Sequence, residues 1–256
     1  MPIVRTDEWL EKHPLKLCER LTPYFEHATA RGIYLHLTHH GMYSSTEKVT
    51  ETVTEMKQKR IWERVDALYQ QLRKRWNGPD IPIFIFPANA RNRKLARDFN
   101  SKGGLAYHDK LFLFLLPHHE TKEIAAVLTH EYNHVCRLEK QPKEEYTLLD
   151  GIILEGLAEQ AVGQFVGKAY EAKWTTYYSD DELRKFWRKY VAPHQSIPPS
   201  HSLHDRLLYG RGWYPPLLGY AVGYGIVRQA LQKGENFSKL MEIPSERIVQ
   251  LSRFGE

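Results

Sequence analysis

The sequence predicts an α+β fold that is predominantly helical, with a small sheet and a helical C-terminal lobe. Several long segments repeat apolar side chains at the period of an α-helix. Near the middle of the chain lie two short apolar segments bounded by Gly and Pro, a pattern typical of strands. With 256 residues, the chain is long enough for a single domain of two lobes, at about 1–140 and about 141–256.

The first part of the chain is expected to be helical. Residues 6–43 read as short helices interrupted near Pro14, Pro23 and Gly32. Residues 45–76 give the clearest long helix, which Asn-Gly-Pro ends at 77–79. Its apolar side chains recur at helical spacing, at Val49, Val53, Met56, Ile61, Val65, Leu68 and Leu72.

The small sheet is expected between this helix and the next. Residues 81–86, IPIFIF, are the first strand candidate, and a basic loop follows at 87–98. A second extended segment covers 105–107 and 110–116 and ends at Pro117.

A helix is predicted for Thr121–Lys140, and within it residues 130–134 read HEYNH. Positions four apart lie on one face of a helix, about 6 Å apart along its axis. His130 and His134 can therefore point an imidazole nitrogen at one metal ion. Glu131 lies about 100° round the helix, within reach of a water bound to that ion.

A second helix, predicted at 148–167, carries two carboxylates four residues apart in the apolar run IILEGLAEQAV. Buried carboxylates are rare without a partner, and a cation is a suitable one. A catalytic zinc has three protein ligands and an open position for water. Glu155 is the natural third ligand beside His130 and His134, which gives one Zn²⁺ per chain.

The spacing of the motif distinguishes among zinc hydrolases. A metzincin would need Gly and His where this chain has Arg137 and Lys140, so that class is excluded. A glutamate on the following helix, with an acidic residue one turn later, resembles the gluzincin pattern. By that resemblance Glu155 binds the metal, and Glu159 accepts a hydrogen bond from a zinc-bound histidine. The chain departs from the best-known gluzincins at Glu159, where those proteins have an aspartate. The roles could also be exchanged, with Glu159 on the metal and Glu155 behind it.

The motifs HEYNHVCRL and LEGLAE resemble the bacterial YjaZ-type family of predicted zinc-dependent proteases. The resemblance extends over most of the chain and includes a late GYAVGYG segment. It implies a zincin-like metalloprotease fold and peptidase chemistry on a peptide or protein substrate, and it brings no known substrate.

The expected mechanism follows from these residues. Glu131 is the general base that takes a proton from the zinc-activated water. Tyr220 is the first candidate to donate a hydrogen bond to the developing oxyanion; Tyr224, His201 and His204 are rivals. Both tyrosines have a simpler explanation, because the neighbouring glycines would allow close helix packing.

Residues 111–115 lie directly before the HEYNH helix. As an edge strand they could hold a substrate backbone in extended form by β-augmentation. An ordinary buried strand is an equally good explanation of this apolar run.

The composition of the chain indicates which kinds of partner and compartment to expect. The net charge of +5 is dispersed among acidic residues, which favours a solvated surface over a nucleic-acid interface. The N-terminus has no signal-peptide pattern, and the longest apolar run, at 111–117, is far too short to span a membrane. Two cysteines are too few for a disulfide framework, and Cys136 is expected to be a small buried side chain. These features fit a reducing cytoplasm.

Two further functions remain open on the sequence. The chain could be a zinc-containing binding or regulatory protein with a silent peptidase-like site. Glu131 argues against this, because a purely structural zinc site needs no general base. A DNA-binding regulator ranks lower, since no basic recognition helix stands out. The oligomeric state is not indicated.

Overall fold

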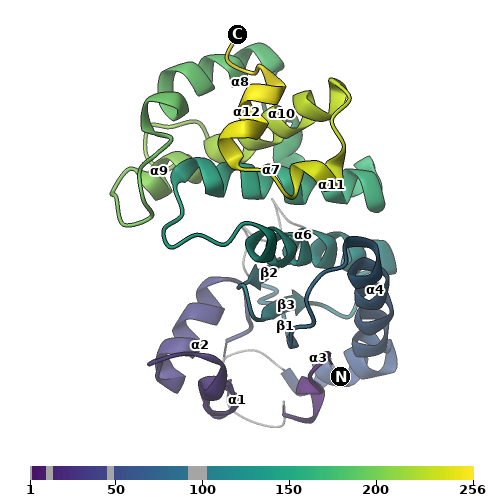
Figure 1. Cartoon of the computed structure of the whole chain (residues 1–256). Coiled ribbons are helices and arrows are strands. Elements are labelled where there is room, and N and C mark those ends of the chain that lie inside the picture. Colours follow the sequence, from purple (N-terminus) through teal and green to yellow (C-terminus); the bar gives the residue numbers. More distant parts are fainter. Residues whose placement is uncertain (1, 10–13, 45–48, 92–102) are drawn as a thin grey trace. The chain divides into compact units, whose positions relative to one another are not determined.

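The computed structural model describes residues 2–9, 14–44, 49–91 and 103–256, and it confirms an α+β chain that is mostly helical (Figure 1). The chain forms two compact units, Met1–Val135 and Cys136–Glu256, each with its own buried apolar core. The boundary falls inside one helix, α6 (Thr121–Lys140), whose bounds are those predicted. That the two units form a single catalytic domain stays a prediction.

The first unit contains a three-stranded sheet of β1 (Ile83–Pro87), β2 (Gly103–Ala106) and β3 (Leu111–Leu115). The strand order is β1-β3-β2, with β1 parallel and β2 antiparallel to β3. Every residue of β1 and β3 is buried, which explains their continuous apolar sequences, whereas β2 is half-buried.

Four helices precede and flank the sheet in the first unit, with bounds that differ in two places from those expected. They are α1 (Pro14–Leu21), α2 (Ala30–His39), α3 (Val49–Gln58) and α4 (Ile61–Trp76). The expected break at Gly32 is wrong, because Thr29 caps α2 by accepting a hydrogen bond from the Gly32 N–H.

The predicted single helix at 45–76 is also wrong. Arg60 adopts a left-handed conformation, with φ of 52°, and divides the segment into α3 and α4. A left-handed residue cannot continue an α-helix, although the apolar spacing on either side is helical. Residues 45–48, where the predicted helix begins, lie outside the described residues.

The second unit is built around the helices α7 (Leu148–Phe165) and α10 (Leu218–Gln232), with four shorter helices beside them. Glycines allow the two backbones to touch: a Cβ on Gly156 would lie 2.9 Å from Tyr224 N. A Cβ on Gly223 would lie 2.8 Å from the carbonyl carbon of Ile152 and would overlap its oxygen. The shorter helices are α8 (Asp180–Phe186), α9 (His204–Leu208), α11 (Phe237–Leu240) and α12 (Ser245–Ser252).

The structure bears on two further predictions, the absence of a membrane span and the burial of Cys136. Among the described residues, none of the helices combines the length and apolar character needed to cross a bilayer. Cys18 and Cys136 are both buried, so Cys136 is the small buried side chain that was predicted.

Candidate metal centre

The HEYNH motif lies on α6, where the predicted one-face arrangement of its histidines is confirmed. The rings of His130 and His134 lie 4.7 Å apart between centroids and are inclined at 83°. His134 is buried and His130 is half-buried. Two imidazoles placed in this way can supply two nitrogen ligands to one ion.

Tyr132, in the middle of the motif, fixes this part of α6 within the first unit. Its hydroxyl donates a 2.8 Å hydrogen bond to the carbonyl of Pro79, just past the end of α4. Its ring packs against Tyr69 and Trp76 of α4, at centroid distances of 5.1 Å and 6.1 Å. The buried ring and its satisfied hydroxyl hold α6 in one rotational setting, which also sets the direction of the two histidines.

Glu131 is buried and lies against the backbone of β2. A Cβ on Gly104 would lie 2.6 Å from Glu131 Cδ and 2.8 Å from Oε1, closer than real Cβ contacts occur. Only glycine therefore leaves room for the carboxylate in this position. The sequence showed the Gly103-Gly104 pair, but not which side chain it accommodates.

The prediction that 111–115 form the substrate-binding edge strand is wrong. These residues are β3, which is the central strand and has β1 on one side and β2 on the other. Its backbone groups are used by the sheet, so it has no edge to offer. Within the described residues, β2 is the edge strand on the side where Gly104 meets Glu131.

The second unit presents the two glutamates of α7. Glu155 is half-buried and Glu159 is buried. Glu159 Oε1 accepts a 2.5 Å hydrogen bond from the backbone N–H of Ala172, which fixes its carboxylate. Its expected hydrogen bond to a zinc-bound histidine stays a prediction.

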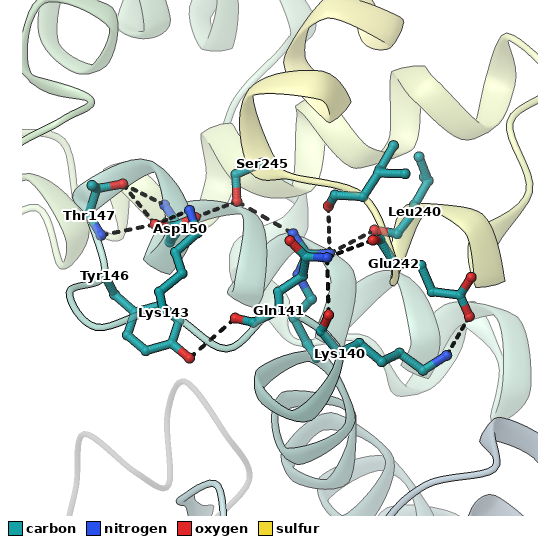
Figure 2. A network of polar contacts seen from close by, with 11 residues as sticks. Lys140, Gln141, Lys143, Tyr146, Thr147, Asp150, Leu240, Glu242 and Ser245 are labelled. Carbon is teal, nitrogen blue, oxygen red and sulfur yellow. Dashed lines mark hydrogen bonds and ion pairs between the residues drawn. The ribbon is translucent and has the colours of Figure 1, made fainter.

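A polar network fixes the start of α7, about two turns before Glu155 (Figure 2). Asp150 and Thr147 form a capping box, and Lys143 binds both oxygens of the Asp150 carboxylate at 2.7 Å and 2.9 Å. Ser245 donates a 2.7 Å hydrogen bond to the same carboxylate. The first turn of α7 is thereby joined to α12.

The last turn of α6 joins the same network in the second unit. The buried guanidinium of Arg137 donates to the carbonyl oxygens of Leu240 and Ile243, at 3.1 Å and 2.7 Å, and reaches Ser245 at 3.5 Å. Figure 2 shows how these contacts link the end of α6, the start of α7 and the segment before α12. Buried charge-assisted hydrogen bonds of this kind hold their elements in one geometry.

Sequence reasoning missed Tyr209, the residue directly after α9. Burial, and to a smaller extent the charge of Glu155, raise the pKa of its phenol above the ordinary value, so it stays protonated at neutral pH. Its ring lies 5.8 Å from that of Tyr220, which itself packs edge-on against Trp174 at 5.5 Å. No motif in the sequence marks Tyr209; only the fold of α9 onto α7 brings it there.

The other candidate oxyanion donors are placed differently. The Tyr224 hydroxyl donates a 2.8 Å hydrogen bond to Glu171, and burial together with Glu171 raises its pKa. His201 is exposed, whereas His204 is buried with Nδ1 3.2 Å from Asp205 Oδ1. Close packing explains the glycines around Tyr220 and Tyr224, and the role of Tyr220 as a donor stays a prediction.

The residues predicted to hold one metal ion are His130, His134 and Glu155. Two imidazoles and one carboxylate are a donor set typical of catalytic zinc. The histidines belong to the first unit and Glu155 to the second, so the shared ion is a proposal about how the two units act together.

Comparison with known proteins gives the class of protein. Residues 61–250 match the family model described as "Predicted Zn-dependent protease (DUF2268)", and the chain belongs to this family. It is 40% identical to the "Uncharacterized protein YjaZ" of Bacillus subtilis (strain 168), over 97% of this chain and 98% of that relative. The predicted YjaZ-type family is therefore confirmed. No solved structure matches the chain, and the zincin-like fold stays a prediction.

Proposed function

We propose that the chain is a zinc-dependent metallopeptidase with one Zn²⁺ held by His130, His134 and Glu155. The observation that carries the proposal is the placement of Glu131, a buried carboxylate seated on Gly104 and directly beside two histidines on one helix face. A zinc site with only a structural role needs no such carboxylate. Membership of a family of predicted zinc-dependent proteases supports the same chemistry.

Each residue has a distinct task in this proposal. When bound, zinc supplies a Lewis acid that lowers the pKa of a bound water towards about 7 and polarises the scissile carbonyl. Glu131 accepts the proton of the attacking water and passes it to the leaving amine. Tyr220, with Tyr209 beside it, donates a hydrogen bond to the oxyanion of the tetrahedral intermediate. Glu159 orients a zinc-binding histidine through its outer ring nitrogen.

The substrate backbone adds to the outer edge of β2. An extended peptide there would form main-chain hydrogen bonds with the sheet and would lie beside Glu131, since Gly104 of β2 contacts that carboxylate. Backbone recognition of this kind fits peptides better than small amides, because only an extended chain can continue the sheet.

The test compares Glu131→Gln with Glu139→Gln, an exposed glutamate on the same helix. Each purified variant is assayed for cleavage of an unstructured protein and for zinc content. We expect Glu131→Gln to keep its zinc and to lose at least about 100-fold in turnover, the typical contribution of a general base. Glu139→Gln should match the wild type. Full turnover by Glu131→Gln would refute the assignment of the base.

A silent, regulatory zinc protein is the competing function. It predicts one zinc per chain and no zinc-dependent cleavage by the wild type under any substrate screen. In that case, Glu131→Gln would change neither zinc content nor binding of a partner.

A further inference from the structure

Trp213 is fully exposed at the tip of a loop in the second unit. Its side chain is 97% exposed, whereas Trp62, Trp76, Trp174 and Trp187 are all buried. The loop, residues 210–216, connects α9 to α10 and is here called the Trp213 loop. Among the described residues it is the most exposed of the large hydrophobic side chains, and tryptophan is one of the residue types that contribute most to binding at interfaces.

The Trp213 loop is firmly held at its base. The Leu217 N–H donates a 3.0 Å hydrogen bond to the carbonyl of Tyr209, which closes the loop. The Tyr178 hydroxyl donates a 2.9 Å hydrogen bond to the carbonyl of Pro216. Gly210 has a φ of 64°, and a Cβ there would overlap the Pro215 oxygen, so the turn requires glycine. The fold therefore presents Trp213 outward from a defined support.

Cations stacked on aromatic rings surround this loop. Arg211 lies 4.8 Å from the ring of Tyr209, and Arg206 lies 5.6 Å from the ring of Tyr214. The Tyr214 ring in turn contacts Tyr190 at 5.4 Å. We define the Trp213 surface as Lys189, Tyr190, Arg206, Arg211, Trp213 and Tyr214.

The Trp213 surface is positive. Its three cations are all exposed, and Lys189 lies 4.9 Å from the ring of Tyr190. Asp205, at 3.6 Å from Arg211 in an exposed ion pair, offsets only part of that charge. Trp, Tyr and Arg are the residue types that dominate binding energy at protein interfaces.

The same loop starts beside the predicted oxyanion donor, Tyr220. Its first residue follows Tyr209, whose ring lies 5.8 Å from the ring of Tyr220. Within the second unit, a polypeptide held on the Trp213 surface would thus leave it close to Tyr220. This continuity favours a substrate over a partner that has no need to reach the predicted site.

We propose that the Trp213 surface binds an acidic segment of the polypeptide substrate, with Trp213 packed on an apolar side chain of that segment. The cations Lys189, Arg206 and Arg211 attract the acidic residues, and the rigid loop keeps the ordering cost of binding low. The proposal rests on the proposed peptidase function and adds a class of substrate to it.

The test measures binding apart from cleavage. Fluorescein-labelled peptides of alternating Glu and Phe, or alternating Lys and Phe, are titrated with the zinc-loaded, full-length Glu131→Gln protein, and anisotropy gives Kd. We expect the acidic peptide to bind and the basic one not to, with affinity falling as salt rises. Introducing Trp213→Ala into the Glu131→Gln protein should raise the Kd for the acidic peptide about tenfold or more, as for an interface hot spot. Trp213→Phe should restore most of the affinity.

Leu35→Ala is the matched control, because Leu35 is an exposed apolar side chain of the first unit, 57% exposed. It should leave Kd unchanged. Equal binding of both peptides, or a Kd unaffected by Trp213→Ala, would overturn the proposal. Trp213-dependent binding to phosphatidylglycerol vesicles without peptide binding would also overturn it and assign the surface to a membrane. Failure of zinc-dependent cleavage, with Trp213-dependent peptide binding intact, would instead contradict only the peptidase function.

Discussion

Gly104 of β2 and Glu131 of α6 are in direct contact, so close that a Cβ on the glycine would lie 2.6 Å from the carboxylate carbon. The contact joins the edge strand of the sheet to the predicted general base. One glycine thus leaves room for the carboxylate of the predicted general base and places the strand that we expect to hold the substrate.

Gly104→Ala should therefore lower turnover and leave the zinc content unchanged. The new methyl group would push Glu131 aside, and a displacement of about 1 Å costs on the order of 100-fold in rate. Turnover and zinc content of the purified variant check this expectation. Gly32→Ala is the control, because a Cβ there meets Thr29 Oγ1 at an ordinary 3.4 Å. An active Gly104→Ala enzyme would show that Glu131 does not need its present position.

Gly223→Ala should destabilise the second unit. A Cβ at Gly223 would overlap the backbone oxygen of Ile152, so α7 and α10 would have to separate. Overpacking of this kind costs roughly 1–3 kcal/mol, more than the helix propensity that alanine adds. Urea unfolding measures the difference. Gly151→Ala, whose Cβ would meet Leu208 at 3.8 Å, should be neutral or slightly stabilising. Equal stabilities of the two variants would disprove the close contact.

The network around Asp150 predicts a loss of stability in acid. Burial would raise the pKa of Asp150, but hydrogen bonds from Lys143, Ser245 and Thr147 outweigh it, so the pKa lies below its ordinary value. The carboxylate thus stabilises the fold above the unfolded pKa of about 3.9, and this contribution is lost as pH falls through the folded pKa.

Asp150→Asn should lower the free energy of unfolding by roughly 1.5–3 kcal/mol at pH 7, the usual range for hydrogen bonds to charged groups. The difference in unfolding free energy between the wild type and the variant should become smaller as the pH falls below about 4. Denaturant titrations from pH 3 to pH 7 would measure this difference. Asp181→Asn is the control, since that side chain is 86% exposed. A gap that is independent of pH would mean that the charge of Asp150 contributes nothing.

Local patterns predicted much of the fold. Thr121–Lys140 is helical throughout because its apolar spacing is continuous, and the start of α7 follows from the Thr147 cap. The break at Arg60 was not predictable. Left-handed residues are usually Gly or Asn, and an arginine in this conformation does not change the spacing of the apolar residues around it. Strand order was missed for a similar reason, since pairing depends on contacts between segments distant in the chain.

In the candidate site, too, local spacing was predictable from the sequence, whereas contacts between distant segments were not. The HEYNH spacing placed His130 and His134 on one helix face, because four residues make about one helical turn. The contact of Glu131 with Gly104 and the packing of Tyr209 against Tyr220 needed the fold, since each joins elements that the sequence keeps apart. The shared role of His130, His134 and Glu155 at one ion remains the central proposal.

That proposal is tested most directly by the zinc content per chain, measured by elemental analysis after dialysis. We expect one zinc in the wild type and none in His134→Ala or Glu155→Ala, because each removes one of three ligands. His108→Ala, which changes a side chain that is 80% exposed, should keep its zinc. A folded wild type that refuses zinc, or a Glu155→Ala variant that retains it fully, would contradict the account.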